Sequence, residues 1–377
     1  MSGAGNRVHG LAGDSDMAEP DWPPLNAGEL VPLLARYPAL GALRAIVWHS
    51  PRPLSAAALV DCAGGRVFVK RHHRSVRDAA SLGEEHAFAA WLRTHGMPIP
   101  PLHRDCDGQE TVALGDWVYV VQEPAAGLDL YRDTRSWLPL TRPAHASCVG
   151  ATLARLHAAA TGFVAPQRST HVLVARSELI EAADPVAALA AQLPARPGLA
   201  RFLAARDWRR ELTVTLAPFH ARLQPALVCQ PRAWTHGDFY ASNLFWSTAG
   251  DAAQVTAVVD FGLCARTFAL FDLATAIERS AIAWLQAGED RARNAIALAL
   301  VAGYRSLRPL GAQDLAVLAD LLPLVHVDFA LSEVEYFDAI TRNRANAELA
   351  WSAFLHGHAR WFTTPHGRAM LDALRAA

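Results

Sequence analysis

The stretch Trp-Thr-His-Gly-Asp-Phe-Tyr-Ala-Ser-Asn-Leu occupies residues Trp234–Leu244, and Val-Val-Asp-Phe-Gly follows at Val258–Gly262. The two segments place two carboxylates, Asp238 and Asp260, and one amide, Asn243, close together along the chain. In magnesium-dependent phosphoryl transfer, one carboxylate faces the attacking hydroxyl. A second carboxylate and an amide oxygen hold the metal that bridges the nucleotide phosphates. The pattern of these three residues suits that chemistry.

The three residues have distinct expected roles. Asp238 would accept a proton from an alcohol as the bond to phosphorus forms, a contribution typically worth about 10²–10⁴-fold. Asn243 offers an amide oxygen to Mg²⁺, and Asp260 ends a strongly apolar segment, where a carboxylate is conspicuous. The alternative is that both carboxylates are turn residues beside glycines. The full set favours a site, whereas Asp-Phe-Gly alone would not decide.

Length and composition exclude several classes of protein. The 377 residues are 52% hydrophobic, which is enough for two or three domain cores, and the net charge of −1 favours neither nucleic acid nor a membrane as partner. No segment has the roughly 18 uncharged apolar residues of a membrane span, and no signal peptide is visible, so we expect a soluble, cytoplasmic protein. Five scattered cysteines argue against disulfides or zinc: Cys62, Cys106, Cys148, Cys229 and Cys264.

The chain divides into three parts by composition. Residues 1–25 are rich in Gly, Ser, Asp and Pro and lack periodicity, which predicts a flexible leader. Residues 26–123 mix strand-like and helical patterns, and residues 124–377 are rich in Ala and Leu with long helical periods. We therefore predict an α+β, two-lobed architecture, with a small antiparallel-sheet lobe followed by a large, mainly helical lobe.

The expected elements follow from periodicity and from the positions of Gly and Pro. Strands of the small lobe are predicted at Leu43–His49, Ala57–Cys62, Arg66–Lys70, Thr111–Leu114 and Trp117–Gln122, with a helix over Asp78–Thr94. The large lobe has short strands around Leu244–Trp246 and Val255–Val259. Its predicted helices include Ala144–Ala160, Ser177–Leu193 with a break at Pro185, Gly198–Leu216, and Ala312–Ile340 with a break at Pro323.

Lys70 is the only lysine in a chain that otherwise uses Arg for its basic positions. A compact ammonium and a planar guanidinium are not interchangeable, so some sites retain Lys for chemical reasons. Lys70 falls on the third strand, and Glu85 lies on the following helix, where the two could pair and direct the ammonium at an anionic ligand between the lobes. The alternative is a solvent-facing lysine and a helix-surface glutamate.

Two further residues of the motif region have expected structural roles. His236 would hydrogen-bond backbone near the loop and hold its shape. Asp272, in Phe-Asp-Leu-Ala, would accept hydrogen bonds from backbone amides or cap the helix that follows.

The combined motifs resemble those of the aminoglycoside phosphotransferase/choline kinase/homoserine kinase superfamily, which has the protein-kinase-like fold. The resemblance rests on His-Gly-Asp-Phe-Tyr-Ala-Ser-Asn, Val-Val-Asp-Phe-Gly and Phe-Asp-Leu-Ala, supported by Leu-Ala-Arg-Leu-His at 153–157 and Gly-Met-Pro-Ile-Pro at 96–100. It covers roughly residues 40–300.

The resemblance implies ATP and Mg²⁺ as cofactors and a role for each motif residue. Asp238 would be the catalytic base, and Asn243 and Asp260 the metal ligands. Lys70 would contact the phosphates and be held by Glu85. The hinge would take the adenine, through Gln122, Glu123 and Ala125.

One departure concerns the loop between the first two strands, Ser50–Ser55, which has no glycine. We expect the phosphates to be held there by Ser55 or its neighbouring backbone amides, with Arg52 nearby. The sequence does not distinguish ATP from GTP.

An acidic run on a predicted C-terminal helix indicates the substrate. Its members are Asp328, Glu333, Glu335 and Asp338, with Glu278 earlier, and helical spacing puts Asp328, Glu335 and Asp338 near one side. An acidic pocket would favour an amine-bearing alcohol. The alternative is a solvated helix face. Aromatic side chains that could line the cleft or fill the core are Tyr240, Trp284 and Trp351.

We therefore predict an ATP- and Mg²⁺-dependent phosphotransferase that acts on a hydroxyl of a small, amine-bearing molecule, such as an aminoglycoside, homoserine or a choline-like alcohol. The alternatives are a bacterial Ser/Thr protein kinase of the same fold and a non-catalytic nucleotide-binding scaffold.

Overall fold

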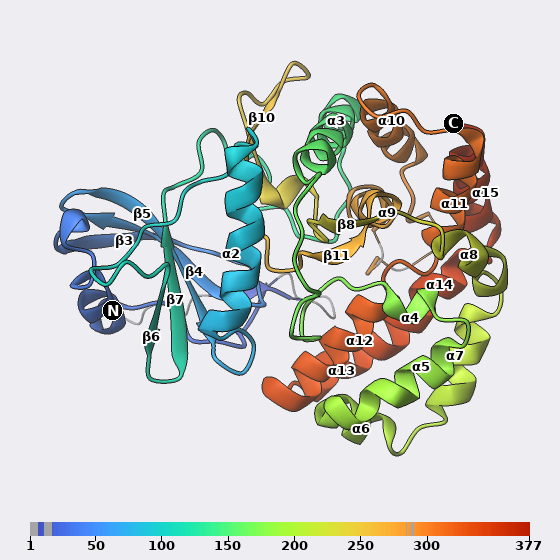
Figure 1. The fold of residues 1–377 in the computed structure, drawn as a ribbon, viewed down its shortest axis with the longest axis horizontal. Coiled ribbons are helices and arrows are strands. Elements are labelled where there is room, and N and C mark those ends of the chain that lie inside the picture. The colour runs from blue at the N-terminus through green and yellow to red at the C-terminus, as the bar shows by residue number, and fades with distance from the viewer. Residues whose placement is uncertain (1–6, 11–16, 284, 287, 289) are drawn as a thin grey trace.

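A five-stranded antiparallel sheet with the order β3-β4-β5-β7-β6 forms the smaller lobe in the computed structural model (Figure 1). The structure describes residues 7–10, 17–283, 285–286, 288 and 290–377. The predicted α+β, two-lobed architecture is confirmed. The strands are β3 (Leu43–His49), β4 (Ala56–Cys62), β5 (Gly65–His73), β6 (Thr111–Leu114) and β7 (Trp117–Gln122).

Two helices accompany the sheet. Helix α1 (Ala27–Leu34) begins at Asn26, whose side chain accepts from the Glu29 amide in a capping box, and it buries its leucines in the core that the sheet provides. Helix α2 (Ala79–Thr94) lies between the sheet and the larger lobe (Figure 1). Its Leu82 packs against residues of β7, whereas Phe88 and Leu92 join the core of the larger lobe. The helix therefore contributes to both cores.

The larger lobe is mainly helical, as predicted. Its helices are α3 (Pro143–Ala159), α4 (Glu178–Glu181), α5 (Pro185–Gln192), α6 (Pro197–Leu203), α7 (Trp208–Leu216), α8 (His220–Leu227), α9 (Ala269–Ala281), α10 (Asn294–Arg305), α11 (Ala312–Leu321), α12 (Val327–Glu335), α13 (Arg344–Leu349), α14 (His358–Trp361) and α15 (Pro365–Arg375). The breaks predicted at Pro185 and Pro323 are confirmed, because Pro185 begins α5 and Pro323 separates α11 from α12. The helix predicted over Gly198–Leu216 is divided into α6 and α7.

Two short two-stranded antiparallel sheets flank the loops that carry the motif residues. Strand β8 (Arg232–Thr235) pairs with β11 (Ala265–Phe268), and β9 (Leu244–Trp246) pairs with β10 (Val255–Val258). The loop from β8 to β9 contains Asp238 and Asn243, and the loop from β10 to β11 contains Asp260. Both loops therefore begin and end on paired strands.

The N-terminal segment differs from the predicted flexible leader. Strand β1 (Val8–His9) pairs with β2 (Met17–Ala18), and Val8 is buried. The Trp22 indole nitrogen donates to the Tyr336 hydroxyl of the larger lobe at 2.8 Å. Strand pairing and an aromatic contact to the larger lobe are therefore present within residues 7–10 and 17–25. Residues 1–6 and 11–16 lie outside the described part.

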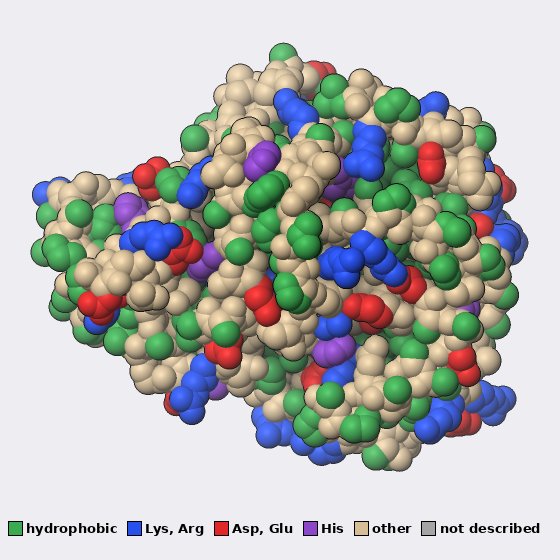
Figure 2. All heavy atoms as spheres, in the orientation of Figure 1, with side chains coloured by type: hydrophobic (Ala, Val, Ile, Leu, Met, Phe, Trp, Pro, Cys, Tyr) green, Lys and Arg blue, Asp and Glu red, His purple; other side chains and the backbone are tan. Residues whose placement is uncertain are grey.

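The surface agrees with the near-zero net charge. On the face drawn in Figure 2, basic and acidic side chains lie interspersed over both lobes. None of the described helices combines the length and the hydrophobicity that crossing a bilayer requires.

Candidate active site

The carboxylate of Asp272 in α9 anchors the loop that carries Asp238. It accepts the backbone N–H of His236 at 2.9 Å and that of Gly237 at 2.8 Å. The predicted backbone-accepting role of Asp272 is confirmed. Its carboxylate also lies 3.0 Å from His157 Nε2 in α3. Burial would raise the pKa of Asp272, but the bond to His157 and the charges around it keep that pKa below its usual value.

His236 and Gly237 shape the same loop. His236 Nε2 lies 3.1 Å from the Val259 carbonyl, and its Nδ1 accepts the Asp238 N–H at 3.2 Å, so the predicted backbone contacts of His236 are present. Gly237 has a φ of +75°, and a Cβ there would lie 2.6 Å from the Leu263 carbonyl oxygen. Only glycine fits that position without strain.

Asp238 lies beside two polar partners. Asn243 Nδ2 donates to its backbone oxygen at 2.8 Å and to Oδ2 at 2.9 Å, while Arg279 Nε lies 3.5 Å from Oδ1. Burial raises the pKa of Asp238, and the Arg279 guanidinium opposes that shift without cancelling it. A carboxylate with this raised pKa is better suited to accept a proton than an ordinary surface aspartate.

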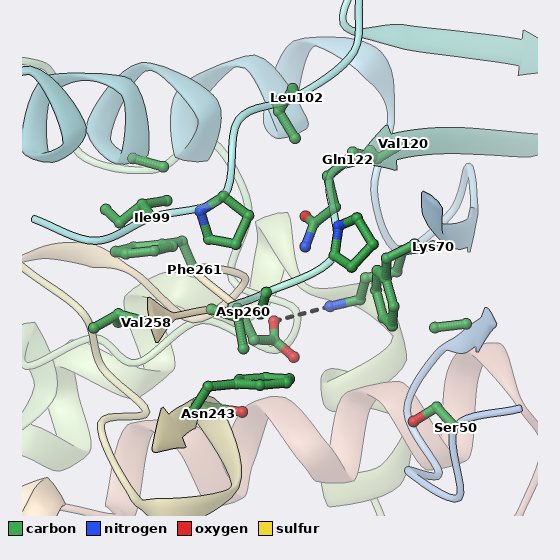
Figure 3. A pocket seen from close by; sticks show the side chains of 18 of the residues that line it. Ser50, Lys70, Ile99, Leu102, Val120, Gln122, Asn243, Val258, Asp260 and Phe261 are labelled. Atoms are coloured by element: carbon green, nitrogen blue, oxygen red, sulfur yellow. Dashed lines mark hydrogen bonds and ion pairs between the residues drawn. The ribbon is translucent and has the colours of Figure 1, made fainter. Parts of the chain in front are cut away.

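Asp260 and Lys70 form an ion pair between the two lobes. Lys70 Nζ on β5 lies 2.8 Å from Asp260 Oδ1 (Figure 3). The surrounding cleft desolvates the carboxylate, which alone would raise its pKa, but the Lys70 ammonium lowers it to about 2. Asp260 has a φ of +63°, an uncommon conformation for a residue with a side chain. Such strain clusters at functional sites.

The oxygen donors of Asp260 and Asn243 fit Mg²⁺. Asn243 directs its amide nitrogen at Asp238, which leaves the amide oxygen without a hydrogen bond from any described residue. Both side chains line the same cavity (Figure 3). A carboxylate and an amide oxygen are ligands that this hard cation prefers, and it keeps several waters as its other ligands.

Glu85 does not pair with Lys70, so the expected ion pair between them is wrong. Its carboxylate instead lies 4.0 Å from Arg77 Nε and 3.5 Å from Arg168 Nη2, two buried guanidinium groups. The carboxylate of Asp260 takes the Lys70 ammonium. Glu85 and Lys70 nevertheless line one cavity.

The larger of two adjoining cavities lies between the lobes and has a volume of about 410 Å³. Its wall includes Lys70, Ile99, Gln122, Val258 and Phe261 (Figure 3). Of the remaining residues predicted to bind nucleotide, Ser55 and Ala125 line it and Glu123 does not. A volume in the range of ordinary ligand pockets, with both apolar and polar or charged side chains in the wall, suits a planar base and its phosphates.

The smaller cavity has a volume of about 130 Å³ and lies on the Asp238 side. It is lined by Asp238, Tyr240, Arg279, Phe329 and Glu333, among others. Both cavities share Lys70, Asn243 and Asp260 in their walls, so the two spaces meet at this trio.

The loop between β3 and β4 is held by Arg52. Its guanidinium donates to the Thr134 carbonyl at 2.9 Å, to Ser136 Oγ at 2.8 Å and to the Tyr131 carbonyl at 3.1 Å. Arg52 and Ser55 line both cavities. Polar contacts to the larger lobe thus fix a loop that contains no glycine.

The acidic residues of the predicted run do not line the cleft as a group. Glu335 pairs with Arg196 at 2.8 Å and Asp338 with Arg201 at 3.3 Å, and Asp328 Oδ2 accepts the Leu179 N–H at 3.3 Å. These three do share a side of the helix, but that side contacts other helices instead of the cleft. Of the run, Glu333 lines the smaller cavity.

The three aromatic candidates fall in different places. Tyr240 lines the smaller cavity, Trp351 is buried in the core of the larger lobe, and Trp284 lies outside the described residues.

Sequence reasoning missed Arg279, which is nine-tenths buried beside Asp238. One available signal was its position on α9 two helical turns after Asp272, because residues at that spacing share a helix face. That face approaches the loop.

Comparisons with known proteins agree with the geometry. The model of the phosphotransferase enzyme family matches residues 55–310. Two curated relatives are named homoserine kinase. The one from Gluconobacter oxydans is 29% identical over 110 residues, which are 29% of this chain and 32% of the relative. The one from Gluconacetobacter diazotrophicus is 29% identical over 249 residues, which are 66% of this chain and 67% of the relative.

Solved structures share the fold at low identity. A microcompartment-associated aminopropanol kinase has a TM-score of 0.57 at 20% identity, covering 91% of this chain and 99% of its own. The amicoumacin kinase hAmiN, in complex with AMP-PNP, Ca²⁺ and Ami, has a TM-score of 0.56 at 15% identity, covering 91% of this chain and 95% of its own. Since the family match spans most of the chain and contains the motif residues from Ser55 to Arg279, this chain belongs to the phosphotransferase enzyme family.

Proposed function

We propose that the protein transfers the γ-phosphoryl group of ATP, with Mg²⁺, to a hydroxyl of a small, amine-bearing molecule. The observation that carries this proposal is the meeting of the two cavities at Lys70, Asn243 and Asp260, with Asp238 on the side of the smaller one. A nucleotide in the larger space would present its terminal phosphate to an acceptor in the smaller space. This arrangement positions both reactants, which is the main requirement of phosphoryl transfer.

In the proposed reaction, the acceptor oxygen forms a bond to the γ-phosphorus while the bond from that phosphorus to the β–γ bridging oxygen breaks. ADP leaves, and the hydroxyl proton goes to the Asp238 carboxylate. Asn243 holds Asp238 through two hydrogen bonds from one amide nitrogen, at 2.8 and 2.9 Å, so the carboxylate is oriented before the acceptor arrives.

On the nucleotide side, Asp260 and Asn243 would hold Mg²⁺, which would neutralise charge on the phosphates. Lys70 would exchange its bond to Asp260 for a phosphate oxygen, because a flexible ammonium can turn between nearby anions. Glu85 stays beside Arg77 and Arg168 and contributes its side chain to the wall of the nucleotide cavity.

The acceptor is expected to be of metabolite size. The smaller cavity, at about 130 Å³, is well below the roughly 300–1,000 Å³ typical of sites for drug-sized ligands, which favours a compact alcohol over an aminoglycoside. Glu333 in its wall supports an amine on that acceptor. The names of the two relatives place homoserine first among the compounds to try.

The test is a coupled assay of ADP release over a panel of amino alcohols, hydroxy-amino acids, sugars and aminoglycosides, with ATP and GTP in parallel. Phosphorus NMR of the product would identify a phosphate monoester. We expect turnover that requires Mg²⁺ and is lost in Asp238→Ala. ADP release that is independent of every acceptor and unaffected in Asp238→Ala would refute the proposal.

A further inference from the structure

One basic and one acidic side chain line the smaller cavity without a hydrogen-bond partner among the described residues. They are Arg279 of α9 and Glu333 of α12, with residue exposures of 9% and 7%. Buried polar groups normally have hydrogen-bond partners, because desolvating a group that has none is expensive. Two such groups facing one cavity therefore indicate a ligand that pairs with both.

Arg279 is held in place while its outer edge remains free. Its guanidinium carbon lies 4.9 Å from the centre of the Phe329 ring, and Nε lies 3.5 Å from Asp238 Oδ1 and 3.5 Å from Glu278 Oε2. Nε is buried and has no hydrogen-bond partner, and neither terminal nitrogen donates to a described residue. Stacking on the ring fixes the plane of a group that can donate two parallel hydrogen bonds.

Glu333 contrasts with its neighbour Glu335 on the same helix. Glu335 is paired with Arg196 at 2.8 Å, whereas no cation lies within 4.0 Å of Glu333 in the described structure, Arg279 included. Burial, together with the nearby acids Glu278 and Asp238, raises the pKa of Glu333 to about 8, although Arg279 acts in the opposite direction. An ammonium beside it would restore the ionised form.

We propose that the acceptor carries both a carboxylate and an ammonium, the carboxylate bound by Arg279 and the ammonium by Glu333. The acceptor class is therefore a small hydroxy-amino acid. This inference rests on the proposed phosphotransfer and names its substrate class. A plain amino alcohol would leave the terminal nitrogens of Arg279 without a hydrogen-bond partner, and a plain hydroxy acid would leave the Glu333 carboxyl group without one.

The position of Arg279 favours the acceptor over the nucleotide as its ligand. Arg279 lines the smaller cavity and is absent from the wall of the larger one, whereas Lys70 lines both. Arg279 is also adjacent to Asp238, which faces the reacting hydroxyl in the proposed mechanism. The hydroxyl and the carboxylate of the acceptor must therefore be only a few bonds apart.

Three compounds test the Arg279 contact and the Glu333 contact separately in the wild-type protein. L-Homoserine has all three groups, 3-aminopropan-1-ol lacks the carboxylate, and 4-hydroxybutyrate lacks the ammonium. With each contact worth the usual amount for a buried charge pair, we expect kcat/KM for L-homoserine to exceed that for either analogue by about 10²-fold or more. Equal values for L-homoserine and 3-aminopropan-1-ol would overturn the role of Arg279 and leave the phosphotransfer intact.

Two variants assign the contacts. Arg279→Gln should reduce the preference for L-homoserine over 3-aminopropan-1-ol by about 10²-fold, and Glu333→Gln should do the same for the preference over 4-hydroxybutyrate. Because each result is a ratio of kcat/KM values for two acceptors, any effect of Arg279 on Asp238 that is common to all acceptors cancels. Glu335→Gln is the matched control and should leave both ratios unchanged.

The outcomes distinguish this inference from the proposed function. If no hydroxy-amino acid is phosphorylated but another alcohol of the panel is, the proposed substrate class is wrong and the phosphotransfer stands. If no acceptor in the panel is phosphorylated, the proposed function fails as well. The wild-type series needs no variant, so misfolding of Arg279→Gln would not prevent the test.

Discussion

Lys70 Nζ lies 2.8 Å from Asp260 Oδ1, and this single bond joins residues 190 positions apart, one from each lobe. The ammonium stands on the sheet of the smaller lobe, and the carboxylate stands on a loop between two short strands of the larger lobe. Both cavities have this pair in their walls. The pair therefore marks the place where a nucleotide and an acceptor would meet.

Lys70→Arg should impair catalysis although it keeps the charge. A planar guanidinium on a different stem cannot place its donors where a compact ammonium does, so we expect kcat/KM for ATP to fall about tenfold or more. Steady-state kinetics with varied ATP would measure this. Arg74→Lys just after the same strand, where Arg74 forms an exposed pair with Asp116 outside both cavities, is the control and should behave as wild type. Unchanged kinetics in Lys70→Arg would remove Lys70 from the phosphate site.

Asp238→Ala should lower kcat by about 10²-fold or more while ATP binding stays nearly intact, because the carboxylate would act on the acceptor proton and not on the nucleotide. Calorimetric titration with a non-hydrolysable ATP analogue would measure binding, and ADP release would measure turnover. Asp251→Ala, at an exposed position in the β9–β10 hairpin, is the control. If the two variants have equal kcat, Asp238 is not the base.

Asp260→Ala should abolish the dependence of nucleotide binding on Mg²⁺, since the principal oxygen donor for the ion would be lost. Titrating a fluorescent ATP analogue with and without Mg²⁺ would measure the effect in both proteins. The wild type should bind more tightly with the ion present. A variant that keeps this difference would show that Asp260 is not a metal ligand.

Gly237→Ala should destabilise the protein by about 1–3 kcal/mol, because alanine is strained at a φ of +75° and its Cβ would meet the Leu263 carbonyl at 2.6 Å. Gly83→Ala in α2 is the matched control, since its Cβ would meet nothing within 4 Å and alanine favours helix. Urea unfolding of both variants should give opposite signs. Equal stabilities for Gly237→Ala and wild type would show that the loop can relax.

Glu333→Gln should make stability less dependent on pH. Because the folded protein raises the pKa of Glu333 from 4.5 to about 8, it binds this proton more tightly than the unfolded chain does. The resulting stabilisation is fully present below the unfolded pKa and is lost as pH rises through about 8. At about pH 8, Glu333→Gln should therefore be more stable than wild type by roughly 1–3 kcal/mol, and the gap should narrow toward pH 5.

Glu335→Gln is the matched control for that measurement. It breaks the buried pair with Arg196, so it should destabilise the protein at both pH values. Urea unfolding at about pH 5 and about pH 8 would measure the free energy of unfolding of both variants and the wild type. A constant difference between Glu333→Gln and wild type would mean that Glu333 titrates normally.

The parts of the site that were predictable lie close together in sequence. Asp238, Asn243 and Asp260 fall within one short span, and the turn and strand signals around them fix their relative placement. The contacts of His236 and Asp272 were predictable for the same reason, since backbone amides of a tight loop need nearby acceptors.

The remaining features depend on residues that are distant in sequence. Glu85 was expected to meet Lys70, but Arg168, contributed by a segment far along the chain, competes for it. Glu335 and Asp338 lie on the same side of their helical segment. That side faces α6, because Glu335 pairs with Arg196 at the start of α6 and Asp338 pairs with Arg201 within it. The N-terminal segment lacked periodicity, and some of its contacts, such as the bond from Trp22 to Tyr336, are made with residues far along the chain. Pairing choices of this kind are settled by tertiary packing, which local patterns do not contain.

Because Lys70 is the only lysine, the protein has a single side-chain amine that can be acylated. An adenosine nucleotide carrying an acylating group on its terminal phosphate reacts with amines, and this chain offers it one side-chain amine, on the strand that faces the larger cavity. Acylation of this one side chain, alongside that of the α-amino group, would therefore report occupancy of that cavity. Intact-protein mass measurement could follow it without peptide mapping, and competition by unlabelled nucleotides would rank their affinities directly.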